Sequence, residues 1–300
     1  MKKIFLGVFI IFLFFSCKSS CTKIGSKNAN YIPYYLKVYE ADSLFVVGNY
    51  QDSYDILDNL FKKYEPINTF KFDEYSTFCK LKIILNKKLN QDDFFKLVSK
   101  YGYDNDWLET DSILSSYYKT FEKMDIKYKS ARELYLKSIN LKLRNDIVIL
   151  INQDQKYRIG NKTSESQQMR NYADSVNQTE LMRIFRDFGY PNMSMIGNYT
   201  IDKKLVSISP ILYHTSTSIN NEYFFKNVFE NMRQGNEEPD VYAFMIDRFN
   251  MFRNITQIYG TFKDNLKLSE REINKNRHLI GLPSLGYVDW KNNLLNPEPK

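Results

Sequence analysis

Apolar residues recur every three or four positions along most of this 300-residue chain, with polar and charged residues between them. This spacing places the apolar side chains on one side of an α-helix. In the segment 51–64, for example, the apolar face is made by Tyr54, Leu57, Leu60 and Phe61. Further helices are predicted over 34–47, 72–86, 91–100, 106–122 and 129–157. We therefore expect an all-α, mainly helical fold.

Start and stop signals bound the predicted helices in the last third of the chain. Ser269 and Glu272 have the spacing of a capping box, in which each side chain accepts a hydrogen bond from the backbone amide of the other residue. This helix is predicted to reach about Ile280 and to end at Gly281. Pro239, with acidic neighbours, predicts the start of another helix.

The segment 34–66 has the pattern of two helices joined by a tight turn. Gly48 permits the turn, Tyr50 packs against it, and Pro66 ends the second helix. This pattern resembles one tetratricopeptide hairpin, although Ser53 stands where that repeat has alanine. A single repeat cannot bury its own faces, and no second copy follows. We therefore expect a helical-hairpin region and not a solenoid.

Arginine marks a change in composition along the chain. Residues 22–131 contain no arginine and no histidine, whereas every arginine lies at or after Arg132. These two residue types suit anion binding and acid–base chemistry, so a site is expected in the second half. An incidental preference for lysine is the plainer explanation. We divide the mature chain into a flexible tether (17–30), a helical-hairpin region (31–145), a compact helical C-terminal domain (146–290) and a tail (291–300).

The first 17 residues combine two lysines, an apolar run and a cysteine. The run over 4–15 is too short to cross a hydrocarbon core of ~30 Å, and it has the length of the apolar region of a signal peptide. The sequence Phe14-Phe15-Ser16-Cys17 resembles a bacterial lipobox, with Phe14 where leucine is usual. The resemblance implies that residues 1–16 are a lipoprotein signal peptide and that Cys17 is lipidated. A plain secretory signal and a membrane span are the alternatives.

Residues around the leader indicate where the mature protein is held. Lys18 follows Cys17, so the acidic residue that signals inner-membrane retention is missing. By resemblance to other lipoproteins, this favours the outer membrane of a Gram-negative cell envelope, with membrane contact through the lipid on Cys17. The formal net charge of +7 is spread along the chain, so no nucleic-acid partner is expected. Cys21 and Cys79 do not by themselves demand a disulfide.

Short polar motifs follow one another over residues 145–285. They are Asp154-Gln155-x-x-Arg158, Asp174-x-x-Asn177, Gly189-Tyr190-Pro191, Gly197, His214, Asp247-Arg248, Gln257-x-Tyr259-Gly260-Thr261, Arg277 and Gly281-Leu282. In this order and spacing they resemble an uncharacterised bacterial domain family that is common in exported proteins. The sequence departs from the family's pattern at Phe262, where a polar residue is expected. The resemblance implies a shared fold unit and a shared site, but no reaction.

Ten of these residues are candidates for a polar pocket: Asp154, Gln155, Arg158, Asp174, His214, Asp247, Arg248, Gln257, Tyr259 and Arg277. Asp154 and Arg158 are four apart and share a helix face. Arg248 lies in an apolar helix and must be paired or line a pocket, because burying a lone charge costs several kcal/mol. Arginines suit carboxylate, phosphate or sugar-acid ligands. We expect a binding or interaction protein with a small anionic ligand here and a protein partner for 31–145.

Two other functions remain open from the sequence. His214 beside Asp174 or Asp247 could act as a general base of an envelope hydrolase or transferase, or the ion pairs could be structural only. The chain has no nucleophile elbow, phosphate loop, dinucleotide fingerprint or zinc-protease motif, so no cofactor is expected. Its two histidines, His214 and His278, are 64 residues apart, so no metal site is expected.

Overall fold

The computed structural model describes residues 21–69, 71–120, 124–158, 163–264 and 266–296. These residues form fifteen α-helices and no strand, which confirms the predicted all-α fold. The helices are α1 (Ile32–Val46), α2 (Tyr50–Lys63), α3 (Glu74–Ile84), α4 (Gln91–Ser99), α5 (Asn105–Thr110), α6 (Leu114–Tyr118), α7 (Met124–Ser138), α8 (Leu141–Lys156), α9 (Ser164–Phe188), α10 (Met193–Ile196), α11 (Ser209–Thr215), α12 (Asn221–Arg233), α13 (Pro239–Phe252), α14 (Glu270–Leu279) and α15 (Tyr287–Leu295). The predicted signal peptide and Cys17 lie outside the described residues.

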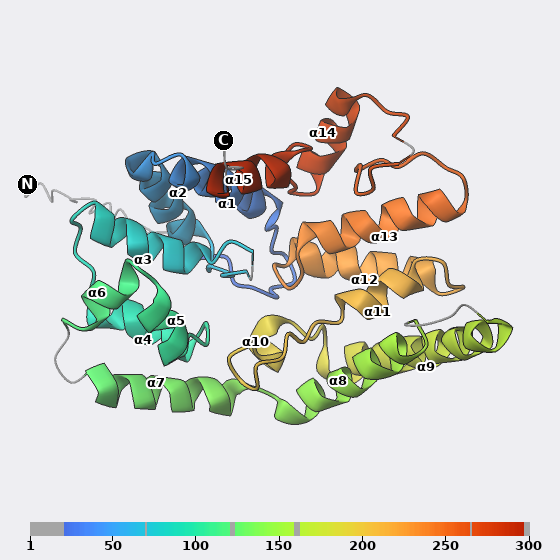
Figure 1. The fold of residues 1–300 in the computed structure, drawn as a ribbon, viewed down its shortest axis with the longest axis horizontal. Helices are drawn as coiled ribbons and strands as arrows, with labels where there is room; N and C mark the ends of the chain where they lie inside the picture. Colours follow the sequence, from blue (N-terminus) through green and yellow to red (C-terminus); the bar gives the residue numbers. More distant parts are fainter. Residues whose placement is uncertain (1–20, 70, 121–123, 159–162, 265, 297–300) are drawn as a thin grey trace, which may run out of the picture.

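The chain returns to its starting point. In Figure 1 the chain runs through α1 to α6 and then away along α7 and α8; α9 turns back beside α8, and after α10 to α14 the last helix, α15, lies beside α1. The Tyr287 ring meets the Tyr39 ring edge-on, with 5.3 Å between centroids, and Lys291 Nζ lies 2.6 Å from a carboxylate oxygen of Asp42. The predicted tail therefore begins inside a packed helix and not after it.

The helical hairpin predicted over 34–66 is present as α1 and α2. Gly48 makes the turn with a φ of +81°, and Ser53 Oγ donates to the carbonyl oxygen of Ala41 at 2.8 Å. The buried Ser53 hydroxyl, at the position where the repeat has alanine, therefore has a hydrogen-bond partner inside the hairpin.

Two long predicted helices are each divided in two. The segment 106–122 contains α5 and α6, because the Asp111 carboxylate accepts from the amide of Leu114 and begins a new helix. The segment 129–157 contains α7 and α8, because the Asn140 side chain caps α8 by accepting from the amide of Leu143 at 3.0 Å. Each break follows from a local side-chain cap, which competes with a continuous helix.

The hydrophobic cores do not follow the expected boundary near residue 145. One cluster joins the buried residues of α1 to α7 with five residues of the second half, namely Met232, Ala243, Tyr259, Ile280 and Leu282. The second cluster is built from α8 to α13, together with the loops before α10 and before α11. The C-terminal half therefore completes the core of the N-terminal half.

The described part of the expected tether, residues 21–30, is held against the body. The amide of Thr22 donates to the carbonyl oxygen of Lys63 at 2.8 Å, and the amide of Gly25 donates to that of Gln234, also at 2.8 Å. Ala29 is buried. This stretch differs from a flexible tether, because its backbone hydrogen bonds are made to two distant parts of the fold.

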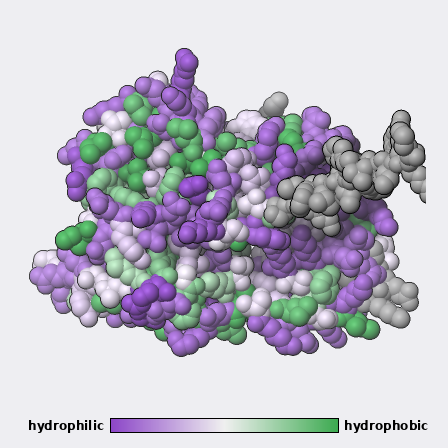
Figure 2. Space-filling model, turned by 180° about the vertical axis from the view of Figure 1, so that it is seen from behind, coloured by the Kyte–Doolittle hydropathy of each residue, from purple (hydrophilic) through white to green (hydrophobic). Residues whose placement is uncertain are grey.

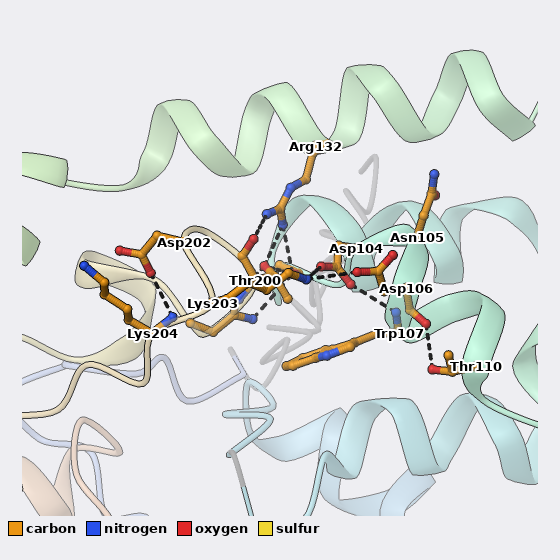
Figure 3. Close-up of polar contacts among 12 residues, drawn as sticks. Asp104, Asn105, Asp106, Trp107, Thr110, Arg132, Thr200, Asp202, Lys203 and Lys204 are labelled. Carbon is orange, nitrogen blue, oxygen red and sulfur yellow. Dashed lines mark hydrogen bonds and ion pairs between the residues drawn. The ribbon is translucent and has the colours of Figure 1, made fainter.

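A polar junction joins α5 and α7 to the loop before α11 (Figure 3). The Arg132 guanidinium donates to the hydroxyl and to the carbonyl oxygen of Thr200, both at 2.9 Å. Lys203 Nζ lies 2.9 Å from Asp104 and 3.0 Å from Asp106. These contacts fix the two halves relative to each other through the loop at 197–204.

The surface away from this junction is mixed in character. Figure 2 shows hydrophilic residues over much of one face, with separate groups of hydrophobic ones. Among the described residues, no helix combines the length and the hydropathy needed to cross a bilayer.

Arg144 is buried and holds the backbone around the loop 197–204 in place. Its replacement is expected to destabilise the fold. Its guanidinium donates to the carbonyl oxygens of Ile196, Gly197 and Lys204 and pairs with Asp202. Arg144→Met leaves these acceptors without a donor, so we predict a loss of about 3 kcal/mol in the free energy of unfolding. Denaturant unfolding followed by circular dichroism measures this loss.

Arg186→Met, at an exposed side chain on α9, serves as the control and is expected to change stability by less than about 0.5 kcal/mol. Equal midpoints for the two variants would contradict the role given to Arg144.

Candidate functional site

Six of the ten candidate residues form one group, which we call the arginine cluster: Asp154, Gln155, Arg158, Asp174, His214 and Arg248. They come from α8 and the residues just after it, from α9, from α11 and from α13. Asp154 contacts Gln155, Arg158 and His214, and Arg158 also binds Asp174. Arg248 belongs to the group through its charge, which interacts with those of Asp174 and Arg158. Four separate helices thus bring together motifs that are nearly 100 residues apart.

Asp154 is the buried centre of the arginine cluster, with an exposed fraction of 1%. Its carboxylate accepts from Arg158 Nη2 at 2.8 Å, from Arg158 Nε at 3.1 Å and from Gln155 Nε2 at 2.7 Å. The predicted pair four residues apart is therefore present, and it lies inside the domain. A buried carboxylate is tolerated when charge-assisted hydrogen bonds satisfy both of its oxygens.

Arg158 bridges two carboxylates. Its Nη2 atom also makes a short hydrogen bond to Asp174. Burial raises the pKa of Asp174, and the nearby Asp154 charge adds to this rise, whereas Arg158 and Arg248 oppose it. Arg158 thus uses its Nε and Nη2 atoms on these two carboxylates.

His214 lies against Asp154, with its Nε2 atom 3.5 Å from the carboxylate. Within the described residues, Asp154 is the only carboxylate within 4.0 Å of this ring. The expected pairing with Asp174 or Asp247 is therefore not the one observed. Burial lowers the pKa of His214 to about 4, and the charges of Arg158 and Arg248 add to this effect against that of Asp154. The imidazole is neutral near pH 7 and can accept a proton or a hydrogen bond.

Arg248 has hydrogen-bonding capacity that the described residues do not use. Its Nε atom is buried and has no partner among them. The guanidinium lies over the Phe252 ring, with 5.2 Å from Cζ to the centroid. Burial lowers the pKa of Arg248, and the charge of Arg158 lowers it further, while Asp174 opposes both.

Asn177, one helical turn after Asp174, also has buried polar atoms without hydrogen-bond partners among the described residues. Its exposed fraction is 1%, and both polar atoms of its side chain lack a hydrogen-bond partner among the described residues. A buried amide without partners costs about 1–3 kcal/mol. An arginine donor and an amide are thus left unsatisfied beside α9.

The other four candidates form a separate group, which we call the loop clamp: Asp247, Gln257, Tyr259 and Arg277. The buried Asp247 carboxylate accepts from the amide of Ile258 at 2.8 Å and from the amide and hydroxyl of Thr261 at 3.0 and 3.1 Å. Arg277 donates to the carbonyl oxygen of Tyr259 at 2.9 Å. The clamp therefore binds the backbone after α13 and offers no free carboxylate to His214.

Phe262, the position at which a polar residue was expected, fits the loop clamp through its backbone. Its amide donates to Gln257 Oε1 at 2.9 Å, and its carbonyl oxygen accepts from Gln257 Nε2 at 3.2 Å. Its ring packs 4.8 Å from that of Phe244. The contact that matters uses main-chain atoms, so the side chain can be aromatic.

Sequence reasoning did not find a second polar group, which lines a cavity beside the start of α13. It consists of Lys71, Glu237, Glu238 and Asp240. The acidic run before and after Pro239 was interpreted only as the start of a helix. Three acidic residues within four positions were the available signal.

Comparisons with known proteins add no assignment. No family model matches the chain, and no curated protein or solved structure matches it. The resemblances over 145–285 and 34–66 therefore stay predictions. Among the residues that the structure describes, no group of three or more histidine, cysteine, aspartate or glutamate side chains is arranged to hold a metal ion.

Asp247→Asn is expected to destabilise the C-terminal half. The amide side chain offers one acceptor oxygen in place of two, and its NH₂ group faces backbone donors. We predict a loss of about 2 kcal/mol in the free energy of unfolding, measured by denaturant unfolding of the full chain. Asp289→Asn, at an exposed position on α15, is the control and should be neutral. A neutral Asp247→Asn would show that the clamp adds nothing to stability.

Proposed function

We propose that the protein is a lipid-anchored binding protein of the cell envelope, held in the outer membrane through Cys17, and that its arginine cluster takes a small anionic ligand. The leader sequence supports the anchor, and the geometry of the cluster supports the ligand. A carboxylate, a phosphate or a sugar acid is the class of ligand that an arginine with free donors recognises.

The observation that carries this proposal is the unpaired Arg248. Asp154 and Asp174 both pair with Arg158, so the charge of Arg158 is already compensated within the protein. Arg248 lies close enough to Asp174 for their charges to interact, yet its buried Nε atom has no partner within the described residues. An anion that accepts from Arg248 would satisfy this donor and offset the cost of burying the guanidinium.

Asn177, one helical turn after Asp174 on α9, and His214, which feels the charge of Arg248, suit the rest of such a ligand. The amide of Asn177 can donate to a second oxygen of the anion. The neutral imidazole of His214 can accept from a hydroxyl group or donate to an anion oxygen, depending on its tautomer. A hydroxy acid or a sugar acid would use all three groups.

A thermal-shift measurement on the full chain in detergent tests the anion site. D-glucuronate or inorganic phosphate is expected to raise the melting midpoint of the wild type, because a ligand that binds only the folded state stabilises it. Arg248→Gln should remove this shift. Arg253→Gln is the matched control, since Arg253 is an exposed arginine stacked on Phe249 at the end of the same helix.

The outcomes separate binding from structure. An anion-dependent shift that Arg253→Gln keeps and Arg248→Gln loses would support the proposal. No shift in the wild type with any of the anions, together with a much lower midpoint for Arg248→Gln alone, would mean that the arginine cluster is structural.

The lipid anchor is tested separately. Cys17→Ser is expected to abolish incorporation of an alkyne-labelled fatty acid and to release the protein from sedimented membranes. Cys21→Ser keeps Cys17 and should behave as the wild type. Labelling that survives in Cys17→Ser and is lost in Cys21→Ser would contradict the assigned lipidation site.

An envelope hydrolase or transferase is the second candidate, and the neutral His214 beside the buried Asp154 favours it. A histidine held by a carboxylate is the arrangement of a general base. The binding account predicts that the wild type hydrolyses no p-nitrophenyl ester, phosphate or glycoside above background. Turnover that His214→Gln abolishes and Arg253→Gln retains would establish the enzymatic alternative.

A further inference from the structure

A cavity of about 260 Å³ lies between the two halves of the chain. Its N-terminal wall comes from α1 and from residues 67–69 and 71. Its C-terminal wall comes from α10 and the loops on either side of it, from α11, and from the loop between α12 and α13 with the start of α13. None of the six residues of the arginine cluster lines it. Its volume is just below the usual range for ligand pockets, about 300–1,000 Å³, so it suits a compact molecule.

One wall of the cavity is acidic. Glu237, Glu238 and Asp240 line it together with Lys71. Lys71 Nζ lies 3.0 Å from Glu238 and makes a short ion pair with Asp240. One ammonium group therefore faces three carboxyl groups, and the wall can take a further positive charge.

Two oxygen atoms that line the cavity have no hydrogen-bond partner among the described residues. Asp240 Oδ1 is buried and accepts no hydrogen bond from the described residues. Thr69 lines the same cavity with an exposed fraction of 6%, and its Oγ1 atom is likewise unpaired in the described part of the chain. Asp240 Oδ1 can only accept when ionised, and the Thr69 hydroxyl can accept or donate, so a ligand with several N–H donors could satisfy both.

Burial favours the protonated form of two of these carboxyl groups, those of Glu237 and Glu238. Burial raises the pKa of Glu237 to about 7, although the Tyr190 hydroxyl donates to it at 2.6 Å. Burial and the Asp240 charge raise the pKa of Glu238 to about 8, against the charge of Lys71. The titratable groups that act on these two carboxyls come from five elements: Tyr35 and Tyr39, Lys71, Tyr190, Tyr213 and Asp240.

The remaining walls are apolar. They include Ile67, Ile196, Val206, Ile208 and Val241. An apolar surface inside a cavity contributes about 25 cal/mol per Å² of ligand area that it removes from water. A ligand for this cavity therefore needs an apolar body as well as a charged end.

We propose that the cavity between the two halves binds a small organic ammonium compound, whose apolar body fills the space beside Ile196 and Val206 and whose cationic head donates to Asp240 and Thr69. Metal ions are a poorer match, because the acidic side chains in the described residues do not converge as a metal site. This site is separate from the anion site proposed above, so either assignment can fail without the other.

Calorimetric titration of the full chain in detergent with cyclohexylammonium tests the proposal, with cyclohexanol as the uncharged probe of nearly equal size. We expect cyclohexylammonium to bind and cyclohexanol to bind at least tenfold more weakly. Asp240→Asn should weaken the binding of cyclohexylammonium at least tenfold. Asp289→Asn removes an exposed carboxylate on α15 and should leave it unchanged.

Thr69→Val keeps the shape of the side chain and all charges. It therefore tests the proposal even if Asp240→Asn does not fold. It is expected to weaken the binding of cyclohexylammonium about threefold. The affinity should also rise from pH 6 to pH 8.5, because Glu237 and Glu238 lose protons over this range while an alkylammonium group stays charged.

Three results would overturn the proposal. The first is no heat of binding for cyclohexylammonium at 20 mM. The second is equal affinity for cyclohexylammonium and cyclohexanol. The third is unchanged affinity for cyclohexylammonium in both folded variants, Asp240→Asn and Thr69→Val.

Discussion

The contact between the start of α1 and the loop joining α12 to α13 is the constraint on which the rest of the structure depends. The buried Tyr35 hydroxyl lies 3.0 Å from the carbonyl oxygen of Met232 and 2.8 Å from that of Glu237. The amide of Tyr31 donates to the carbonyl oxygen of Arg233 at 2.7 Å. These bonds fix the loop that carries the acidic wall of the cavity, and they set where α13 begins.

Close packing makes this contact specific. Gly235 has a φ of +82°, and a Cβ atom there would lie 3.0 Å from the Tyr31 ring. A larger residue would therefore need both a strained backbone and a displaced ring. Glycine avoids both costs at this position, and the Tyr31 and Tyr34 rings are fully buried.

Helix α13 carries two polar residues whose side chains make contacts on different sides of the helix. Asp247 and Arg248 are neighbours in sequence, so their side chains are about 100° apart around the helix axis. Asp247 binds the backbone of the following loop, whereas Arg248 joins Asp174 and Arg158 near α9. The sequence motif looked like one site because adjacent positions cannot show which face of the helix each occupies.

The sequence predicted the helices well where periodicity and caps agree. The capping box at Ser269 is present, as are the hairpin of α1 and α2 and the pair of Asp154 with Arg158. The breaks at Asp111 and Asn140 were missed, because one side-chain cap interrupts an otherwise continuous helical pattern.

Contacts made by main-chain atoms and between distant segments could not be predicted. The hydrogen bonds of Thr22 and Gly25 use only the backbone, so they leave no pattern of residue types. The ion pair of Lys71 with Asp240 joins positions 169 apart, and only the folded chain brings them to one cavity.

Hydrogen exchange of the full chain, with and without Tyr35→Phe, tests the central claim most directly. Loss of the Tyr35 hydroxyl should make the amides of 232–238 exchange at least tenfold faster, while the amides of α4 and α7 keep their rates. Tyr223→Phe, at an exposed tyrosine of α12, should change neither. Unchanged protection of 232–238 in Tyr35→Phe would contradict the claim that α1 holds this loop in place.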